Sequence, residues 1–539
     1  MSGTRIAEAL VRRLAQHGVR RFFGVPGGDC SLDLIDAAPR HGLEFVLTRG
    51  ETAAAIMAGV TAELTGTPGV LMTTRGPGLA NAVNGIACAA LDRSPLLVLS
   101  DGQEPGHGHV SHQRLDQAAL LRPLTKGESR LDGADPVAEL DALLGAAQAA
   151  PAGPVYLELI GQRIREAAPA VAGGSDAPPV ARPAVPAPAE AALAAARAVL
   201  GRARRPAIVA GLQALDSGAA EALRGLAARW GCPVLFTYKA KGVLAETDPL
   251  AVGPFIGGAA EDPLLRAADA VLLFGADPIE FPPQPWRYAV PVVELTTHAV
   301  ARPYVAAAAT VAGDLAAAAA ALGDAVAPGG WTAREIAGAR EAMRALALAP
   351  EDGPFSPGAI VAAIAAAVPS GTRIAVDAGA HMLPVMALWP ALAPRGVLIS
   401  RGLATMGYAL PAAIAAALAE PERPVLAFTG DGGLMMAAAE LATAAQLGCR
   451  IIVVVFNDAT MSLIKVKQRR RQLPERGMAY GRSDLATVAR GFGCLGLRVE
   501  SEAELGPALR RALDASGPVL LDVAVDAETY HAVVRRIRG

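Results

Sequence analysis

Short apolar runs alternate with longer stretches of helical character over most of this chain, and no other feature of the sequence constrains the fold more. Apolar runs of this length are typical of strands that are buried on both faces of a parallel sheet. Because parallel strands are joined by crossover connections, usually helices, the pattern predicts α/β domains with right-handed crossovers. The runs that we interpret as strands are 69–74, 95–100, 206–211, 270–276, 424–430 and 451–458.

The length of 539 residues and the hydrophobic fraction of 52% allow several separate cores, and at ordinary domain sizes we expect about three domains. Segment 177–192 is rich in proline and alanine without an apolar period, so we interpret it as an extended linker. A looser break passes through 327–330 and 350–358. The predicted domains are therefore residues 1–165, 190–325 and 355–539.

The first and third of these domains are similar to each other in sequence pattern. Residues 67–102 and 423–458 both contain a strand-like run, a glycine loop, an alanine-rich helix and a second strand-like run. This imperfect repeat predicts two related, doubly wound parallel sheets that carry different chemistry on equivalent loops. For the central domain, the strand and loop pattern predicts a Rossmann-like sheet.

The composition excludes several classes of protein. A formal net charge of −2 gives no general attraction to nucleic acid or to an anionic membrane, and 4% aromatic residues argue against a base-stacking surface. Five scattered cysteines without a CxxC pair indicate neither a disulfide framework nor a zinc site, and they fit a reducing compartment.

Neither a secretory signal nor a membrane span is indicated. The first residues place Ile6, Leu10 and Leu14 on one helical face, and no apolar run is long enough to span a bilayer. We therefore expect a cytoplasmic protein whose partners are small molecules and copies of itself, not nucleic acid or membrane.

The strongest chemical signal is the sequence Gly430-Asp431-Gly432 after a strand-like run, followed by Asn457 at the end of the next run. Because the carboxyl ends of parallel strands meet at one sheet edge, we expect these residues to converge. Carboxylate and amide oxygens suit Mg²⁺, and glycines let backbone N–H groups approach a diphosphate. A lone GDG is usually a turn, but 24 residues separate Gly432 from Asn457, and this spacing resembles the signature of thiamine diphosphate enzymes.

Glu51 provides an independent test at the other end of the chain, because it directly follows a strand-like run. Thiamine diphosphate needs a carboxyl group that hydrogen-bonds ring N1′, so that its own aminopyrimidine removes the thiazolium C2 proton. In isolation, Glu51 reads equally as a helix N-terminal glutamate favoured by the helix dipole. Together with the GDG motif and Asn457, it favours catalysis.

The segments around these residues resemble, in order, the acetolactate synthase-like family of thiamine diphosphate enzymes. They are GVPGGDCSLDLID, RGPGLANAVNGIA, HQRLDQAALLRPLTK, DAGAHM and RGLATMGYALPAAIAAAL, and with Glu51 and the GDG motif the resemblance extends over nearly the whole chain. The resemblance implies a pyrimidine-binding first domain, a central domain and a diphosphate-binding third domain. It also implies a homodimer or homotetramer, in which each site combines the Glu51 domain of one subunit with the GDG domain of another.

By the same resemblance, Asp431 and Asn457 hold Mg²⁺ through their side chains and Ala459 through its carbonyl. Met406 bends the cofactor, and the carbonyl of Ala404, where the family usually has glycine, accepts from the 4′-amino group. The expected catalytic residues are Glu51, Gln113 and His112. The expected cofactor-binding residues are Glu51, Ala380, His381, Ala404, Met406, Gly430, Asp431, Gly432, Gly433, Asn457 and Met461.

Four residues depart from the family pattern or fit it loosely. Asp29 is either an acid at the reacting carbon or a helix cap, and His112 is either a proton donor or a loop histidine. Arg75 replaces a small residue before GPG. Lys467 stands where biosynthetic members carry a tryptophan, and it either pairs with an anion or lies on a solvated helix face.

The central domain lacks the arginine-aspartate stretch that flavin-binding members carry after GA, and FGADP (274–278) is too weak a motif to indicate flavin or NAD. The sequence thus predicts decarboxylation of a 2-oxo acid such as pyruvate with thiamine diphosphate and Mg²⁺, followed by ligation to a second carbonyl. The alternatives are a decarboxylase that releases an aldehyde, a non-catalytic thiamine diphosphate binder, and, last, a nicotinamide or flavin oxidoreductase.

Overall fold

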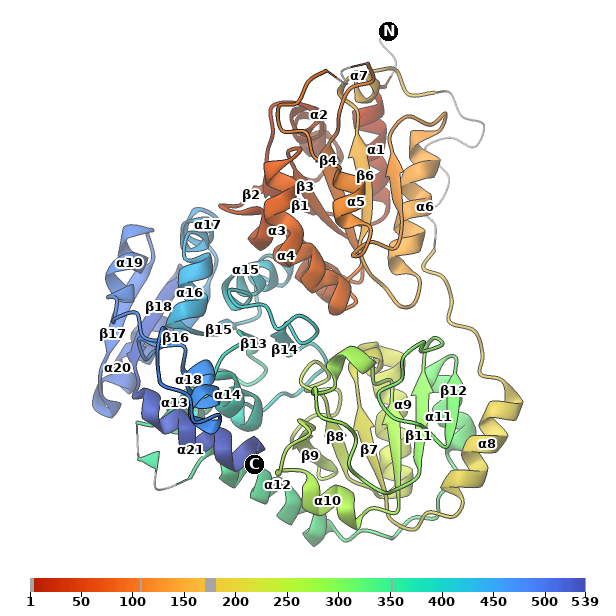
Figure 1. The fold of residues 1–539 in the computed structure, drawn as a ribbon, viewed down its shortest axis with the longest axis vertical. Coiled ribbons are helices and arrows are strands. Elements are labelled where there is room, and N and C mark those ends of the chain that lie inside the picture. Colours follow the sequence, from red (N-terminus) through yellow and green to blue (C-terminus); the bar gives the residue numbers. More distant parts are fainter. Residues whose placement is uncertain (1–3, 107–108, 170–180, 350–351, 354, 539) are drawn as a thin grey trace. The chain divides into compact units, whose positions relative to one another are not determined.

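The computed structural model describes residues 4–106, 109–169, 181–349, 352–353 and 355–538 (Figure 1). It contains three six-stranded sheets in which every pairing between neighbouring strands is parallel, and helices connect the strands. The predicted α/β fold class is confirmed. Two compact units share these elements, the first consisting of the described parts of Met1–Ala184 with Ile414–Pro421 and Ala437–Cys449, and the second of the other described residues.

The first sheet has the strand order β2-β1-β3-β4-β6-β5. Helix α1 buries Ile6, Leu10 and Leu14, as the spacing of these residues predicts. The strands are β1 (Arg21–Val25), β2 (Glu44–Leu47), β3 (Gly69–Thr73), β4 (Leu96–Asp101), β5 (Glu128–Arg130) and β6 (Val155–Leu159). The helices are α1 (Ile6–Gln16), α2 (Cys30–Ala37), η1 (Ala38–His41), α3 (Glu51–Thr65), α4 (Pro77–Leu91), α5 (Gln117–Leu121), α6 (Pro136–Gln148) and α7 (Gly161–Ile164).

The central sheet has the order β9-β8-β7-β10-β11-β12, which is the doubly wound order of dinucleotide-binding folds, so the predicted Rossmann-like domain is confirmed. The strands are β7 (Pro206–Ala210), β8 (Val234–Phe236), β9 (Ala251–Pro254), β10 (Ala270–Phe274), β11 (Val292–Thr296) and β12 (Ala309–Ala312). The helices are α8 (Glu190–Leu200), η2 (Leu212–Leu215), α9 (Ser217–Trp230), α10 (Asp262–Ala267), η3 (Pro278–Glu280) and α11 (Leu315–Leu322).

The third sheet has the order β14-β13-β15-β16-β18-β17, which repeats the order of the first sheet strand for strand. The predicted relation between the two ends of the chain therefore holds in their topology. The strands are β13 (Arg373–Val376), β14 (Val397–Ile399), β15 (Val425–Gly430), β16 (Ile451–Asn457), β17 (Leu495–Val499) and β18 (Val519–Ala524). The helices are α13 (Pro357–Ala367), α14 (Met382–Leu388), α15 (Ala409–Ala419), α16 (Asp431–Ala437), α17 (Glu440–Gln446), α18 (Ser462–Arg470), α19 (Leu485–Gly491), α20 (Glu502–Leu513) and α21 (Ala527–Arg538).

Two predicted breaks need correction. In the linker predicted at 177–192, residues 177–180 lie outside the described residues, 181–189 form neither helix nor strand, and Glu190 already begins α8. The looser break predicted at 327–330 and 350–358 has helix α12 (Ala333–Ala347) between its two segments, and α13 already begins at Pro357 within the second. Helix α12 begins with a capping box between Thr332 and Glu335. The three domain limits themselves stay a prediction.

The cores lie where the apolar runs predict them. Strands β3, β4, β7, β10 and β16 are buried along their whole length, since parallel sheets in α/β folds are covered on both faces. All five cysteines are buried and form no disulfide. In the part of the chain that the structure describes, no helix is both long and apolar enough to cross a membrane.

A buried carboxylate occupies the carboxyl edge of the central sheet. Glu280 is 2% exposed, and one of its oxygens accepts the backbone N–H groups of Leu212 (2.9 Å) and Asp277 (3.0 Å), while the other accepts the hydroxyl of Thr237. Nucleotide phosphates in Rossmann-like folds bind to N–H groups at this edge. In this domain the carboxylate of Glu280 already accepts such N–H groups, which counts against a bound flavin phosphate. That the central domain binds no flavin stays a prediction.

Glu280 also predicts a pH dependence of stability. Burial raises its pKa to about 7, so its contribution to stability is complete below the unfolded value of 4.5 and is lost as the pH rises through 7. Between pH 5 and pH 8 the loss from this group is expected to be about 2.5 kcal/mol. Urea unfolding at pH 5 and pH 8 should show this loss in the native protein but not in Glu280→Gln, and an equal pH dependence in both would contradict it.

Candidate functional site

A cavity of about 220 Å³ opens in the second unit beside the carboxyl ends of β13, β15 and β16. It brings together residues that are as far apart in sequence as Ala380 and Met461. Of the residues that the sequence predicts to bind a cofactor, nine line this cavity: Ala380, His381, Ala404, Met406, Gly430, Asp431, Gly432, Gly433 and Met461.

Asp431 is held between two loops at the start of α16. It is 6% exposed, and its Oδ2 accepts the backbone N–H of Ala459 at 2.7 Å. Its Oδ1 accepts the backbone N–H of Gly432 at 2.8 Å and the hydroxyl of Tyr480 at 2.7 Å. The carboxylate is therefore fixed in place before any ligand binds. No sequence motif marks Tyr480, which lies in a loop after α18.

Asn457 ends the neighbouring strand β16, and the pairing of Gly430 with Phe456 places it beside Asp431. The residue is fully buried, yet its Oδ1 has no hydrogen-bond partner among the described residues. Buried polar atoms without partners are rare and costly, so this oxygen is suited to bind a ligand.

The donor set here fits Mg²⁺ rather than a thiolate- or imidazole-bound metal. A carboxylate, an amide oxygen and a main-chain carbonyl are hard ligands, and the described residues hold no group of three or more His, Cys, Asp or Glu side chains that could bind a metal ion. The third predicted ligand, Ala459, has a left-handed backbone (φ +61°), and its carbonyl accepts the N–H of Tyr480 at 3.1 Å. That carbonyl keeps a second lone pair for a cation.

His381 is a neutral, buried polar group in the same cavity. It is 4% exposed, and burial lowers its pKa to about 4, so the imidazole carries no charge at neutral pH. Its ring stacks on Phe456 with 5.8 Å between the ring centres, and its Nε2 has no partner among the described residues. The one N–H of the neutral ring donates to the backbone of Asp377, so the unpartnered Nε2 carries a lone pair that can accept a hydrogen bond from a ligand.

Asp377, which the sequence reasoning missed, organises the loop that carries Ala404 and Met406. This buried carboxylate accepts the N–H groups of Gly407 (3.0 Å) and Tyr408 (3.1 Å). A Cβ atom on Gly433 would overlap the same carboxylate, so only glycine fits there. The DAGAHM segment was quoted for the resemblance, but nothing in its pattern singles out the aspartate.

Ala404 has a left-handed backbone with φ +55°, a conformation that costs an L-residue roughly 1–2 kcal/mol. The Ala404→Gly variant is therefore expected to be more stable by about 0.5–1 kcal/mol, after the larger chain entropy of glycine is subtracted. Thermal unfolding of the two proteins measures this difference. A variant of lower stability would show that the alanine methyl makes a packing contact worth more than the backbone strain.

In the first unit, Glu51 begins helix α3 and is 9% exposed. Its Oε2 accepts a hydrogen bond from the side-chain amide of Asn81, and its Oε1 lies 3.3 Å from where a Cβ of Gly78 would stand. The carboxylate thus lies against the first turns of α4, where Asn81 orients it. The sequence reasoning quoted the segment that contains Asn81 but assigned this amide no role.

His112 and Gln113 both lie in an exposed turn in the first unit. Gln113 has φ +54°, and its carbonyl approaches Gly76 so closely that a Cβ there would overlap it. The buried amide in this region belongs instead to Gln117, which accepts the N–H of Gly76 at 2.9 Å and donates to the hydroxyl of Tyr156 at 3.0 Å. The roles predicted for His112 and Gln113 stay predictions.

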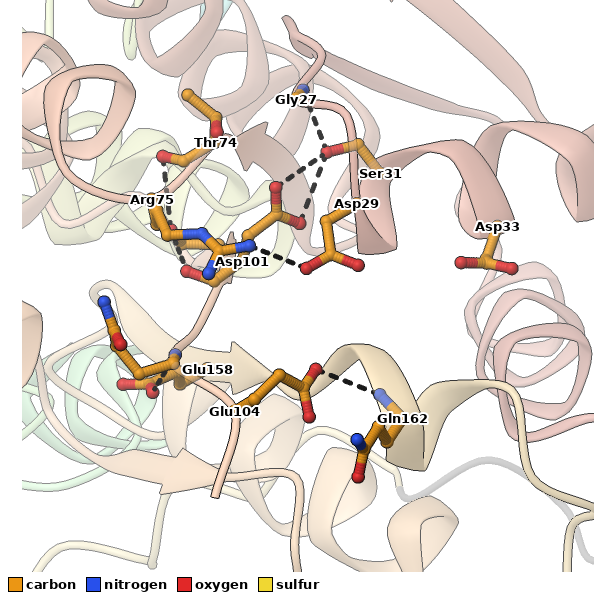
Figure 2. A network of polar contacts seen from close by, with 12 residues as sticks. Gly27, Asp29, Ser31, Asp33, Thr74, Arg75, Asp101, Glu104, Glu158 and Gln162 are labelled. Carbon is orange, nitrogen blue, oxygen red and sulfur yellow. Dashed lines mark hydrogen bonds and ion pairs between the residues drawn. The ribbon is translucent and has the colours of Figure 1, made fainter. Parts of the chain in front are cut away.

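Asp29 does not cap helix α2, so the interpretation as a helix cap is wrong. Figure 2 shows its carboxylate turned toward Arg75, which donates to Oδ2 at 2.7 Å, and Arg165 donates to Oδ1 at 2.8 Å. Behind this pair, Asp101 is 1% exposed, and burial and the charge of Asp29 raise its pKa. Arg75 and Asp29, which both depart from the family pattern, therefore form an ion pair with each other.

Lys467 is exposed on α18, which agrees with a solvated helix face. Its neighbours Lys465 and Arg469 form ion pairs with Glu475 and Glu528 on the same surface.

Two α/β sheets of identical topology, one before and one after a Rossmann-like sheet in the chain, with Asp431 at the cavity and Asn457 on the neighbouring strand, define a cofactor-dependent enzyme. Three family models match the chain in order: the N-terminal TPP binding domain of thiamine pyrophosphate enzymes (residues 4–120), their central domain (193–322) and their C-terminal TPP binding domain (377–523).

The full-length relatives agree. The chain is 30% identical to acetolactate synthase of Bacillus subtilis, covering 96% of this chain and 93% of the relative. It is 31% identical to the probable 2-ketoarginine decarboxylase AruI of Pseudomonas aeruginosa (96% and 93%) and 30% identical to indole-3-pyruvate decarboxylase of Azospirillum brasilense (95% and 94%). The chain belongs to the thiamine pyrophosphate enzyme family, and the predicted acetolactate synthase-like resemblance is confirmed.

Proposed function

We propose that this enzyme decarboxylates a pyruvate-like 2-oxo acid with thiamine diphosphate and Mg²⁺ and joins the remaining fragment to a second carbonyl compound. The observation that carries the proposal is the buried, unpartnered Oδ1 of Asn457 beside the fixed carboxylate of Asp431. Two relatives named acetolactate synthase match the chain over nearly its full length, at about the same identity as the relatives named decarboxylases. They support ligation as the outcome.

The predicted residues of the cavity and its neighbouring loop divide the cofactor between them in this proposal. Asp431, Asn457 and Ala459 would hold Mg²⁺, and His381 with the glycines of the 430–433 loop would face the diphosphate. Ala404, Met406 and Met461 would contact the rings. When bound, thiamine diphosphate supplies an electron sink for the bond that breaks when CO₂ leaves.

Glu51 would hold a proton at the carboxyl oxygen that faces the pyrimidine ring. Asn81 donates to the other end of this carboxyl group, which fixes its orientation and leaves one oxygen free for the cofactor. A protein that only binds the cofactor has no need of this arrangement, which counts against a non-catalytic paralogue.

A second candidate is a decarboxylase that releases an aldehyde without ligation. Two full-length relatives are named decarboxylases, one for 2-ketoarginine and one for indole-3-pyruvate. The ion pair of Asp29 and Arg75 places charge in the first unit where the family has small residues, and the exposed imidazole of His112 offers a proton donor.

Assembly and location stay part of the proposal. We expect a homodimer or homotetramer, with each site built from the Glu51 domain of one subunit and the GDG domain of another, and a cytoplasmic protein. The domain limits 1–165, 190–325 and 355–539 are proposed to mark the pyrimidine-binding, central and diphosphate-binding domains.

CO₂ release tests the proposal directly. Apoprotein supplied with thiamine diphosphate and Mg²⁺ is expected to release CO₂ from at least one acid in a panel of pyruvate, 2-oxobutyrate, indole-3-pyruvate and 2-ketoarginine. Omission of either cofactor should abolish the release. Release that is independent of thiamine diphosphate, or no release from any of the four acids, would contradict the proposed function.

A further inference from the structure

The buried carboxylate of Asp522 lies behind the predicted metal site, outside every motif used so far. It is fully buried on β18, and its Oδ1 accepts the side-chain N–H of Asn457 at 2.8 Å. We propose that Asp522 is a positioning residue: it determines which atom of Asn457 faces the cation, and Arg498 balances its charge. This inference rests on the proposed function, because it concerns the Mg²⁺ site.

The argument begins with the ambiguity of an amide side chain. The two ends of Asn457 have nearly the same shape, but only the oxygen can bind a cation, while the NH₂ group would repel one. In the structure, both protons of Nδ2 have acceptors, since Nδ2 donates to Asp522 at 2.8 Å and to the carbonyl of Ser483 at 3.0 Å. A reversed amide would turn its oxygen toward two acceptors, so these contacts leave Oδ1 facing the site.

Asp522 is itself fixed from the other side. Its Oδ2 accepts the backbone N–H of Leu485 at 3.0 Å and the guanidinium of Arg498 at 2.6 Å. Strand β18 lies between β16 and β17, and Arg498 pairs directly with Asp522 in the register of β17 and β18. Three adjacent strands therefore carry a continuous chain of contacts, from Arg498 at the partly exposed edge strand to Asn457 at the cavity end.

Replacing Asp522 by asparagine reverses this preference. Leu485 and Arg498 both donate, so the single remaining oxygen of residue 522 is needed on their side, and its NH₂ group then faces the NH₂ group of Asn457. Asn457 must rotate or withdraw, which removes its oxygen from the cation. Changes in groups that orient a metal ligand typically weaken metal binding by about 10–100-fold.

The test is calorimetric titration of Mg²⁺ into metal-free protein in a solution that contains excess thiamine diphosphate. Asp522→Asn is expected to raise the Kd of Mg²⁺ by about 30-fold. The matched control is Asp352→Asn, which breaks another buried aspartate and arginine pair in the same unit, with Arg536, and does not line the cavity. This control should lose stability but keep its Kd within about twofold.

A double variant separates positioning from general damage. If Asp522 acts through Asn457, then Asn457→Ala alone and the double variant Asn457→Ala with Asp522→Asn will have the same Kd within about twofold. Should Asp522→Asn fail to fold, Arg498→Gln, which leaves the carboxylate unbalanced, is expected to raise the Kd several-fold, roughly 3–10-fold.

The outcomes are distinguishable. An unchanged Kd of Mg²⁺ in both Asp522→Asn and Arg498→Gln would overturn the inference but not the proposed function. Equal losses of Mg²⁺ affinity in Asp522→Asn and Asp352→Asn would do the same. If the native protein binds no Mg²⁺ in the presence of thiamine diphosphate, the proposed function fails and the inference fails with it.

Discussion

The Glu51→Gln variant is expected to turn over its 2-oxo acid about 10²–10⁴-fold more slowly than the native enzyme. Glutamine keeps the shape of the side chain and can accept from Asn81, but it holds no proton to exchange with the pyrimidine ring. The affinity for thiamine diphosphate should fall far less than the rate. Steady-state kinetics with cofactor in excess, together with calorimetric cofactor binding, measures the two effects separately.

Glu63→Gln is the matched control, because it makes the same chemical change near the other end of helix α3. Its turnover should stay within about twofold of the native value, as is usual for a partly exposed position away from special features. A Glu51→Gln protein that retains full turnover would show that the carboxyl group has no catalytic role, and would favour a protein that binds the cofactor without using it.

The Asp431→Asn variant is expected to lose Mg²⁺ binding by at least about 100-fold, a larger loss than for groups that only orient a ligand. The substitution removes the only negative charge among the three predicted ligands, and an amide at this position cannot accept from Gly432, Ala459 and Tyr480 as a carboxylate does. Thiamine diphosphate should then bind more weakly as well, because in the proposed site Mg²⁺ would hold the diphosphate to these residues.

Titration of Mg²⁺ and Mn²⁺ into the apoprotein measures this loss, and Asp324→Asn serves as the control. Asp324 is an exposed aspartate of the same unit that pairs with Arg229. Metal binding that is equally strong in native protein and Asp431→Asn would place the cation elsewhere and would refute the assignment of Asp431, Asn457 and Ala459.

Much of the fold can be predicted from local sequence patterns. Strands such as β3, β10 and β16 are contiguous apolar runs, because both faces of a parallel sheet are covered, and their existence can be inferred without tertiary information. The similar patterns of 67–102 and 423–458 predicted two related sheets, and their strand orders agree. Helix α12 was missed although its capping box, Thr332 and Glu335, was visible in the sequence.

The site is only partly predictable for a physical reason. Asp431 and Asn457 follow neighbouring strands, so the sheet brings them together and the spacing reveals it. Tyr480 lies 49 residues after Asp431, in a loop, and Asp522 lies 65 residues after Asn457, on a strand much later in the chain. Both nevertheless contact the site. Single polar residues in such positions have no period and no fixed spacing, so only the folded structure shows their contacts.

Asp29 illustrates the same limit in the first unit. Its position before helix α2 favoured a cap on statistical grounds, but tertiary contacts with Arg75 and Arg165 take both of its oxygens. The two arginines come from the loop after β3 and from the end of α7, so tertiary ion pairs form here in place of the local helix cap. The first of these arginines lies directly before the GPG loop, at a position where the sequence departs from the family pattern.

Proton NMR of the enzyme with thiamine diphosphate, Mg²⁺ and pyruvate alone tests the central claim most directly. The account predicts that the pyruvate methyl signal disappears only when both cofactors are present, and that acetolactate replaces it. Acetaldehyde instead would establish the non-ligating alternative. An unchanged spectrum with pyruvate, and with the other 2-oxo acids in turn, would contradict the claim that this cavity serves 2-oxo acid decarboxylation.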